Sequence, residues 1–275
     1  MNTPELAHEA TAYFRDLQAR LVAAFEAFEP VQRFAARSWS KPEGHRLQGG
    51  GESRLMRGAV FEKVGVNVSH VWGVFPKESR AQVAGADESD GRFSACGISL
   101  VAHMANPYVP IVHMNLRYLT TSRTWFGGGA DLTPTFPIAE DTAAFHAALR
   151  GACDAYRPDA YAKYKAWCDR YFYLPHRQEP RGVGGIFFDD LDSGDVHADF
   201  AFVRSVGEAL LAVYPQLVQR RRDTPFDEQA RDALLTKRGR YVEFNLVYDR
   251  GTKFGFSTDA DPEAYLMSLP PLARW

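Results

Sequence analysis

The chain has 275 residues, of which 45% are apolar and 24% charged, and its formal net charge is −2. This length and composition are typical of a soluble globular protein with a sizeable core. The small net charge argues against a strongly basic nucleic-acid or membrane-surface protein, so we expect neither partner. The chain contains no run of about 18 apolar residues, and we therefore predict no membrane span.

The thiols and the N-terminus indicate where the protein works. Cys96, Cys153 and Cys168 have neither metal-binding nor redox spacing. An odd number of such cysteines fits a reducing compartment better than a disulfide framework. The N-terminus also lacks the basic and apolar regions of a signal peptide. We therefore predict a cytoplasmic protein.

The first part of the chain predicts a helix, a loop and a strand. Apolar residues at helical spacing predict a helix over 5–28, which Pro30 ends. The polar, glycine-rich stretch 38–54 is typical of a flexible surface loop, with a basic lid over an anionic ligand as the alternative. Alternating valines predict a strand over 60–74, and a charged loop follows over 76–92.

Polar side chains are most regularly placed between residues 98 and 134. Two apolar, β-branched runs separated by Asn106-Pro107 predict two antiparallel strands. On a period of two, Ser99 and His103 lie on one face of the first strand. One face of the second strand carries an imidazole, an amide and a guanidinium group, those of His113, Asn115 and Arg117. Such a face between apolar flanks is typical of a pocket floor.

The central part of the chain predicts helices around one further strand. Helical apolar spacing indicates helices over 139–156, 158–173 and 196–218, and Pro158 is suited to the first turn of the second. Glycines lead into a predicted strand over 182–191, where the backbone or a ligand can approach closely.

The last part of the chain predicts a helix, a strand and a short helix. Thr224 is a favourable cap for a helix over about 225–236, which Gly239 would close. Alternating side chains predict a strand over 240–249. Asp261-Pro262 predicts the start of a last short helix.

No repeat or low-complexity linker divides the chain. We predict one α+β domain over residues 1–275, a large, mostly antiparallel sheet with helices on both faces. The chain lacks the glycine motif of NAD and FAD sites, the serine elbow of hydrolases and the His-Glu-x-x-His zinc motif. Arginines among strand residues favour a carboxylate or phosphate site over a metal site. The candidate site residues are four histidines, two aspartates and three arginines: His103, His113, His146, His176, Asp131, Asp249, Arg117, Arg181 and Arg250.

Residues 165–189 resemble the signature of the oxygen-dependent coproporphyrinogen III oxidases. This motif contains Trp167-Cys168-Asp169-Arg170-Tyr171-Phe172 and ends in Gly184-Gly185-Ile186-Phe187-Phe188-Asp189. Further matches are His113-x-Asn115-x-Arg117, Trp125-Phe126-Gly127-Gly128-Gly129-x-Asp131, Glu243-Phe244-Asn245-Leu246 and Asp249-Arg250-Gly251-Thr252. The resemblance covers about residues 10–275.

The resemblance implies oxidative decarboxylation of two propionate side chains of coproporphyrinogen III to vinyl groups. The product would be protoporphyrinogen IX, in haem biosynthesis, with molecular oxygen as the acceptor and co-substrate. A reduced pyrrole is electron-rich enough to react with oxygen itself, so no organic cofactor is expected. The enzyme must then hold the tetrapyrrole, orient one propionate and handle protons.

The resemblance also assigns roles to individual residues. His113 is expected to be the proton donor, and Asp131 to lie near the pyrrole N–H groups as a counter-charge or base. Asp249 is a further candidate base, and Arg250 a clamp for the reacting carboxylate. The residues expected to bind substrate are Ser99, Asn115, Leu116 and Arg117. A divalent metal on His103, His113, His146 and His176 is a further implication, with hydrogen-bonded pocket histidines as the alternative.

The family further implies a homodimer to which residues of about 240–275 contribute. Two departures bear on these expectations. Asp259-Ala260-Asp261 stands where the family usually has a Gly-Gly-Arg-like loop that touches substrate, and family chains usually extend beyond Trp275. The alternative functions are a non-catalytic tetrapyrrole-binding protein and, without motif support, a metal-dependent hydrolase.

Overall fold

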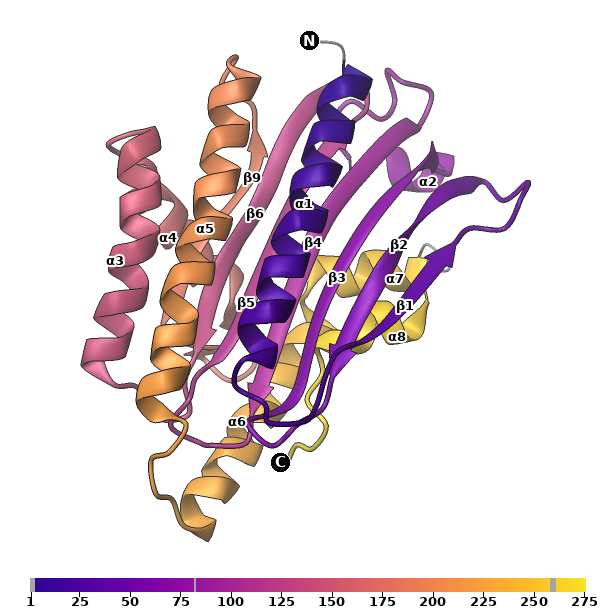
Figure 1. Ribbon diagram of the computed structural model, residues 1–275. Coiled ribbons are helices and arrows are strands. Elements are labelled where there is room, and N and C mark those ends of the chain that lie inside the picture. The colour runs from indigo at the N-terminus through magenta and orange to yellow at the C-terminus, as the bar shows by residue number, and fades with distance from the viewer. Residues whose placement is uncertain (1–2, 82, 258–260) are drawn as a thin grey trace.

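A seven-stranded antiparallel sheet runs through the computed structural model, which describes residues 3–81, 83–257 and 261–275 (Figure 1). Its strand order is β1-β2-β3-β4-β5-β6-β9, so all but the last pair are successive in the chain. The strands are β1 (Ala35–Ser40), β2 (Leu47–Met56), β3 (Phe61–Val74), β4 (Arg92–Met104), β5 (Ile111–Thr120), β6 (Thr124–Thr133) and β9 (Gly184–Leu191). A separate pair consists of β7 (Tyr173–Leu174) and β8 (Glu179–Pro180).

Helices pack on both faces of this sheet, which confirms the predicted α+β class (Figure 1). They are α1 (Thr3–Glu26), α2 (Lys77–Arg80), α3 (Ala139–Tyr156), α4 (Ala160–Tyr171), α5 (Val196–Arg221), α6 (Glu228–Val247), α7 (Arg250–Ser257), α8 (Pro262–Tyr265) and the 3₁₀ turn η1 (Leu266–Ser268). Among the described helices, none combines the length and hydropathy that crossing a bilayer requires.

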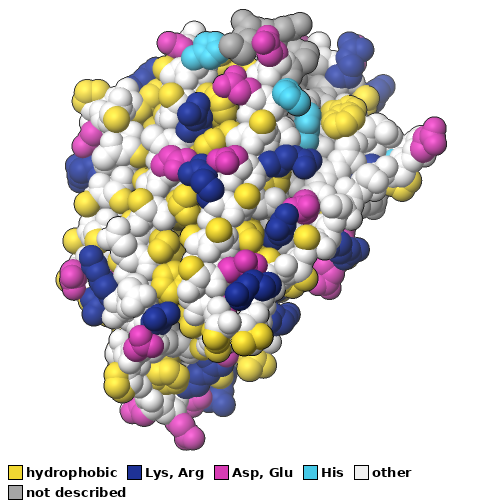
Figure 2. Space-filling view, in the orientation of Figure 1, with side chains coloured by type: hydrophobic (Ala, Val, Ile, Leu, Met, Phe, Trp, Pro, Cys, Tyr) yellow, Lys and Arg dark blue, Asp and Glu magenta, His cyan; other side chains and the backbone are white. Residues whose placement is uncertain are grey.

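The main core lies between the sheet and the helices α1, α3 and α5. On β5 the buried side chains Val112, Met114 and Leu116 point into this core, while His113, Asn115 and Arg117 are half-buried on the other face. The period-two pattern of the sequence therefore separates a packing face from an open one. On the outer surface of these helices, positive and negative side chains are interspersed among apolar ones (Figure 2).

The C-terminal segment covers part of the opposite face of the sheet. Lys63 donates to the carbonyl oxygens of Leu266 and Leu269, at 3.3 and 2.7 Å, and Asn67 donates to that of Ala264 at 2.9 Å. Gly65, between them on β3, leaves room for Met267, whose sulfur would lie 2.7 Å from an added Cβ. These contacts fix α8 and η1 against β3.

Stretch 38–54 is not the loop or lid that its composition predicts. It forms the end of β1 and most of β2, and every residue of β2 pairs with β3, from Leu47 opposite Gly73 to Met56 opposite Val64. Continuous pairing on both sides offsets the low strand propensity of the three glycines. The loop predicted over 76–92 contains the short helix α2.

The strand predicted over 240–249 is wrong, and so is the helix end at Gly239. Helix α6 continues to Val247, and its buried residues recur at helical spacing, at Leu234, Arg238, Tyr241 and Asn245. An alternating pattern and a helical one share several positions in so short a stretch, and packing decided between them. Gly239 instead admits the C-terminal tail, because an added Cβ would lie 2.3 Å from the Arg274 carbonyl oxygen.

Candidate active site

The open face of β4, β5 and β6 gathers the polar residues that the sequence singled out. Antiparallel register places Ser99 opposite Asn115, and Asn115 opposite Gly129. His113 stands opposite Asp131 in the next row of that face. Residues directly opposite in a sheet point to the same side, so the predicted pocket floor is one continuous surface.

A buried ion pair lies at one end of this floor. Asp131 is only 2% exposed, and its two oxygens lie 2.8 Å from Nδ1 of His113 and 2.7 Å from Nη2 of Arg181. Burial alone would raise the pKa of Asp131, but the charges and hydrogen bonds of Arg181 and His113 hold it below its usual value. Asp131 is therefore an anion that fixes the His113 ring and exposes almost none of its own surface.

Arg181 is a buried cation held in an aromatic cage. Its guanidinium carbon lies 4.0, 4.5 and 4.7 Å from the ring centroids of Phe172, Tyr241 and Phe244. Cation–π attraction and the Asp131 carboxylate compensate for the loss of water around this charge. Two of the rings belong to α6, so the helical conformation of this segment is what brings them around Arg181.

A second, more exposed ion cluster lies at the other end of the floor. Asp189, on β9, accepts hydrogen bonds from Arg117 at 2.8 Å and from Arg250. Arg117 also donates to the side-chain oxygen of Asn115 at 3.2 Å. Burial would raise the pKa of Asp189, but Arg117 and Arg250 lower it below the usual value. This cluster can present positive charge to an anionic ligand.

Asp249 and Arg250 lie at the junction between α6 and α7. One oxygen of Asp249 accepts from the Thr252 amide at 2.7 Å and so caps α7, while the other accepts from the Tyr171 hydroxyl at 3.1 Å. The same hydroxyl accepts from the Arg250 amide at 3.1 Å. Asp249 thus has a structural role that the sequence reading did not predict.

Leu116 differs from its two neighbours in the predicted substrate-binding set. Its side chain is fully buried in the core on the opposite face, whereas Asn115 and Arg117 are half-buried on the floor. Leu116 could therefore meet a ligand there only through its backbone. Ser99 is half-buried on the floor beside Asn115.

The four predicted metal ligands have separate partners. Nε2 of buried His103 donates to the Ser268 carbonyl oxygen at 2.8 Å, and burial lowers the pKa of His103 to about 3. His146 contacts the Val183 carbonyl oxygen and the Tyr161 hydroxyl, at 3.0 and 2.9 Å. The ring of His176 lies 2.7 Å from a Glu243 oxygen and 2.8 Å from the Tyr248 hydroxyl, while His113 contacts Asp131.

Within residues 3–81, 83–257 and 261–275, no three His, Cys, Asp or Glu side chains are grouped to hold a metal ion. The four histidines therefore do not fit a shared metal site in this structure. Hydrogen bonding, the alternative that the sequence left open, describes each of them.

Of the loop that departs from the family pattern, residues 259 and 260 lie outside the described residues. Asp261 caps α8 through the Glu263 amide at 3.1 Å and pairs with Arg37 at 2.9 Å. Its charge is thus already balanced by a cation on β1.

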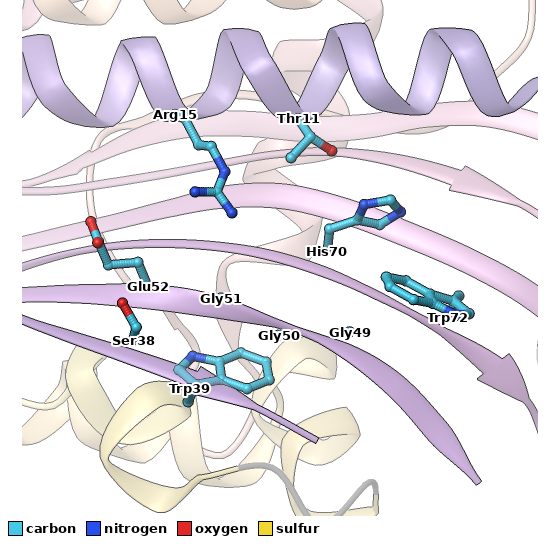
Figure 3. Close-up of a pocket in the computed structure, with 10 residues that line it drawn as sticks. All are labelled: Thr11, Arg15, Ser38, Trp39, Gly49, Gly50, Gly51, Glu52, His70 and Trp72. Atoms are coloured by element: carbon cyan, nitrogen blue, oxygen red, sulfur yellow. The ribbon is translucent and has the colours of Figure 1, made fainter. Parts of the chain in front are cut away.

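A cavity of about 360 Å³ lies away from this floor, beside α1 (Figure 3). Arg15, Trp39, His70 and Trp72 line it, and the glycines 49–51 of β2 form part of its wall. None of the predicted catalytic, substrate-binding or metal residues contributes to it.

Residues 9–275 match the family model described as Coproporphyrinogen III oxidase. The chain belongs to the coproporphyrinogen III oxidase family. This match confirms the resemblance that the 165–189 motif carried, over almost the whole chain.

Relatives in the family are similar along nearly their full length. The protein of Rickettsia bellii (strain OSU 85-389) is 50% identical over 274 residues, which cover 96% of each chain. That of Rickettsia akari (strain Hartford) is 51% identical over 272 residues, again 96% of each chain. Both relatives are named oxygen-dependent coproporphyrinogen-III oxidase.

Sequence reasoning missed Asp189 and the anchoring role of Arg181 in this site. In the sequence, Asp189 stands out only as the end of the family motif, and Arg181 only as one of three arginines. A usable signal was the acidic pair after an apolar strand, Asp189-Asp190, since acids at a buried strand end need partners.

Proposed function

We propose that this protein catalyses the oxygen-dependent oxidative decarboxylation of coproporphyrinogen III. Two propionates become vinyl groups, giving protoporphyrinogen IX in haem biosynthesis. The observation that carries the proposal is the floor of the sheet, on which a cationic cluster and a carboxylate-held imidazole occur in a member of this family. A propionate-bearing tetrapyrrole needs both kinds of group.

Substrate recognition follows from the two ends of the floor. Arg117 and Arg250 suit the substrate carboxylates, because guanidinium groups bind carboxylates through paired, charge-assisted hydrogen bonds. Asn115 and Ser99 lie along the same face and can contact the macrocycle or a second carboxylate. The glycine opposite Asn115, Gly129, adds no side chain to this surface, which suits a flat ligand.

We assign the proton-handling step to His113. Its Nδ1 faces the Asp131 carboxylate, which favours the tautomer with the proton on that nitrogen and leaves Nε2 to exchange a proton with the substrate. Asp131 then acts through His113 rather than on the pyrrole directly, since it is 2% exposed. Molecular oxygen takes the electrons that the reduced substrate releases as each propionate loses carbon dioxide and one hydride equivalent.

Asp249 is retained as a second candidate base. Its place beside Arg250 would bring it near a carboxylate held by that arginine. Both of its oxygens already accept hydrogen bonds, so a capping role and a base role are separate hypotheses.

We also propose a homodimer that uses residues of the C-terminal region. Of the described residues in that region, five large apolar side chains are exposed: Leu246, Val247, Phe256, Leu272 and Trp275. Exposed apolar side chains gathered in one segment are typical of a contact surface. We expect Leu272→Glu to weaken self-association at least about tenfold in analytical ultracentrifugation, while Val31→Glu, at a residue 76% exposed outside the region, has no effect.

We also propose a cytoplasmic location and a reaction that needs no divalent metal. Cys96, Cys153 and Cys168 are buried free thiols, which supports a reducing compartment such as the cytoplasm. Because the histidines do not converge, we expect activity to survive exhaustive chelation. Activity lost on chelation and restored by a divalent ion would reinstate the metal site.

The decisive test adds coproporphyrinogen III to the protein without oxygen, then admits oxygen and measures the product by fluorescence after oxidation. We expect protoporphyrin, with two molecules of carbon dioxide released per molecule. Tight binding of the substrate without product would instead support a non-catalytic tetrapyrrole-binding protein. Hydrolysis of an unrelated ester dependent on added metal would support the hydrolase alternative.

A further inference from the structure

We propose that Asp189 is a positioning residue whose single carboxylate holds the guanidinium groups of Arg117 and Arg250 side by side, as one clamp for a carboxylate of the substrate. This inference rests on the proposed function, because it assigns a substrate propionate to the clamp. Asp189 acts through the two arginines and is not expected to touch the reacting atoms.

The two arginines come from unrelated parts of the fold. Arg117 lies on β5, while Arg250 opens α7. Both reach Oδ2 of Asp189, Arg117 at 2.8 Å. Two guanidinium groups so close together repel each other unless an anion lies between them. Asp189 is therefore what allows a strand arginine and a helix arginine to form one unit.

Asp189 lies on the same face of the sheet as Arg117, just before a bulge. Phe126 pairs with Leu191 and Gly128 with Phe188, so two residues of β9, Asp189 and Asp190, face the single residue Gly127 of β6. Asp190 has φ +51°, in the left-handed region that relieves such an insertion. The regular pairing through Phe188 therefore directs Asp189 to the floor, and the bulge inserts only Asp190 after it.

Gly127 gives the cluster its space. An added Cβ would lie 2.5 Å from Oδ1 of Asp189 and 2.7 Å from Nε of Arg117. Both contacts are shorter than real Cβ atoms make, so alanine there must displace the carboxylate or the guanidinium group. The glycine thus allows Asp189 and Arg117 to meet directly above the strand.

The charge and exposure of the cluster indicate what it binds. One carboxylate between two guanidinium groups leaves one positive charge. The Asp189 side chain is 12% exposed, whereas those of Arg117 and Arg250 are 29% and 58% exposed. The anion is the least exposed member and both guanidinium groups are partly open to solvent, which suits one carboxylate group of a ligand.

The first experiment compares Asp189→Asn with Asp190→Asn in the coproporphyrinogen assay. Asp190 carries the same carboxylate one residue away and is exposed, and asparagine tolerates its φ. We expect kcat of Asp189→Asn to fall at least tenfold while KM changes less than threefold, because both cations remain but lose their alignment. Asp190→Asn should stay within twofold of the wild type. Equal effects of the two variants would overturn the proposal.

A double variant separates positioning from general damage to the fold. If Asp189 acts through Arg250, adding Asp189→Asn to Arg250→Ala should lower kcat/KM by less than threefold further. A structural effect would instead multiply in full. Gly127→Ala should reproduce the loss seen in Asp189→Asn without changing any charge, whereas Gly151→Ala, where no atom lies within 4 Å of an added Cβ, should not. Full multiplication, or an active Gly127→Ala, counts against the clamp.

A measurement without turnover distinguishes this inference from the proposed function. The Nε–Hε NMR signals of Arg117 and Arg250 can be assigned from Arg→Lys variants. We expect both signals to shift and broaden in Asp189→Asn but not in Asp190→Asn. If wild type makes no product yet the signals respond in this way, the proposed function fails and the positioning role stands. Unchanged signals overturn the positioning role whatever the activity.

Discussion

Asp131 on β6 and Asp189 on β9 each join two basic groups, but their surroundings differ. Asp131 is 2% exposed and binds His113 and the buried Arg181. Asp189 is 12% exposed and binds two arginines that are much more open to solvent. The first cluster fixes groups in place, and the second can still accept a ligand.

This difference follows from what covers each carboxylate. The rings of Phe172, Tyr241 and Phe244 surround Arg181, which is 1% exposed, whereas His113 is 21% exposed. Asp189 lies at a bulge near the end of its strand, and Arg250 approaches it from a helix terminus. One kind of ion pair thus serves as framework in one place and as a binding group in the other.

The largest expected effect is on stability. Asp131→Ala should lower the free energy of unfolding by about 3–5 kcal/mol, because it leaves the buried Arg181 without a counter-charge. Asp189→Ala should cost only about 1 kcal/mol, since the arginines it releases can reach water. Urea denaturation measures both values, and similar losses would contradict the contrast between the two clusters.

The next largest effect is on catalysis, and we expect it from one residue of each cluster. His113→Ala and Arg250→Ala should each lower turnover at least about tenfold, equivalent to about 1.4 kcal/mol of transition-state stabilisation. His197→Ala, at an exposed histidine on α5, is the matched control for His113. Steady-state kinetics with coproporphyrinogen III measures both effects. If one of the two variants has an unchanged rate, the residue that it replaces has no role in the mechanism.

Acid should weaken both clusters. The pKa of Asp131 and that of Asp189 are both held below the usual aspartate value of 3.8. A carboxyl with a lowered folded-state pKa contributes its full stability above the unfolded-state value and loses it as the pH falls through the folded-state value. We therefore expect stability to decline below about pH 4. The decline should be shallower in Asp189→Asn, which thermal denaturation across pH measures. A parallel decline in this variant and the wild type would mean that the arginines do not lower the pKa of Asp189.

The smallest expected stability effect concerns Asp249. Asparagine caps a helix about as well as aspartate, so Asp249→Asn should change the unfolding free energy by less than about 0.5 kcal/mol, against about 1 kcal/mol for Asp249→Ala. If Asp249 is also a base, kcat should fall in both variants. An Asp249→Asn protein with normal kcat would leave only the capping role.

The open face of the sheet can be predicted from the sequence alone. Ser99, His113, Asn115 and Arg117 could be placed together because a strand has a period of two and antiparallel register carries that period to its neighbour. The family was equally accessible, because the 165–189 motif is a local run of residues. The sheet with helices on both faces followed from the succession of strand and helix patterns.

The remaining features depend on contacts between distant parts of the chain. Alternation over 240–249 indicated a strand, but the burial of Arg238, Tyr241 and Asn245 against the sheet makes the segment a helix. Pairing along the whole of β2 turned a glycine-rich loop prediction into a strand. The partners of Asp189 come from β5 and α7, and those of the four histidines from separate elements. Local patterns report the conformational preference of a short segment, whereas contacts between distant segments depend on how the whole chain packs.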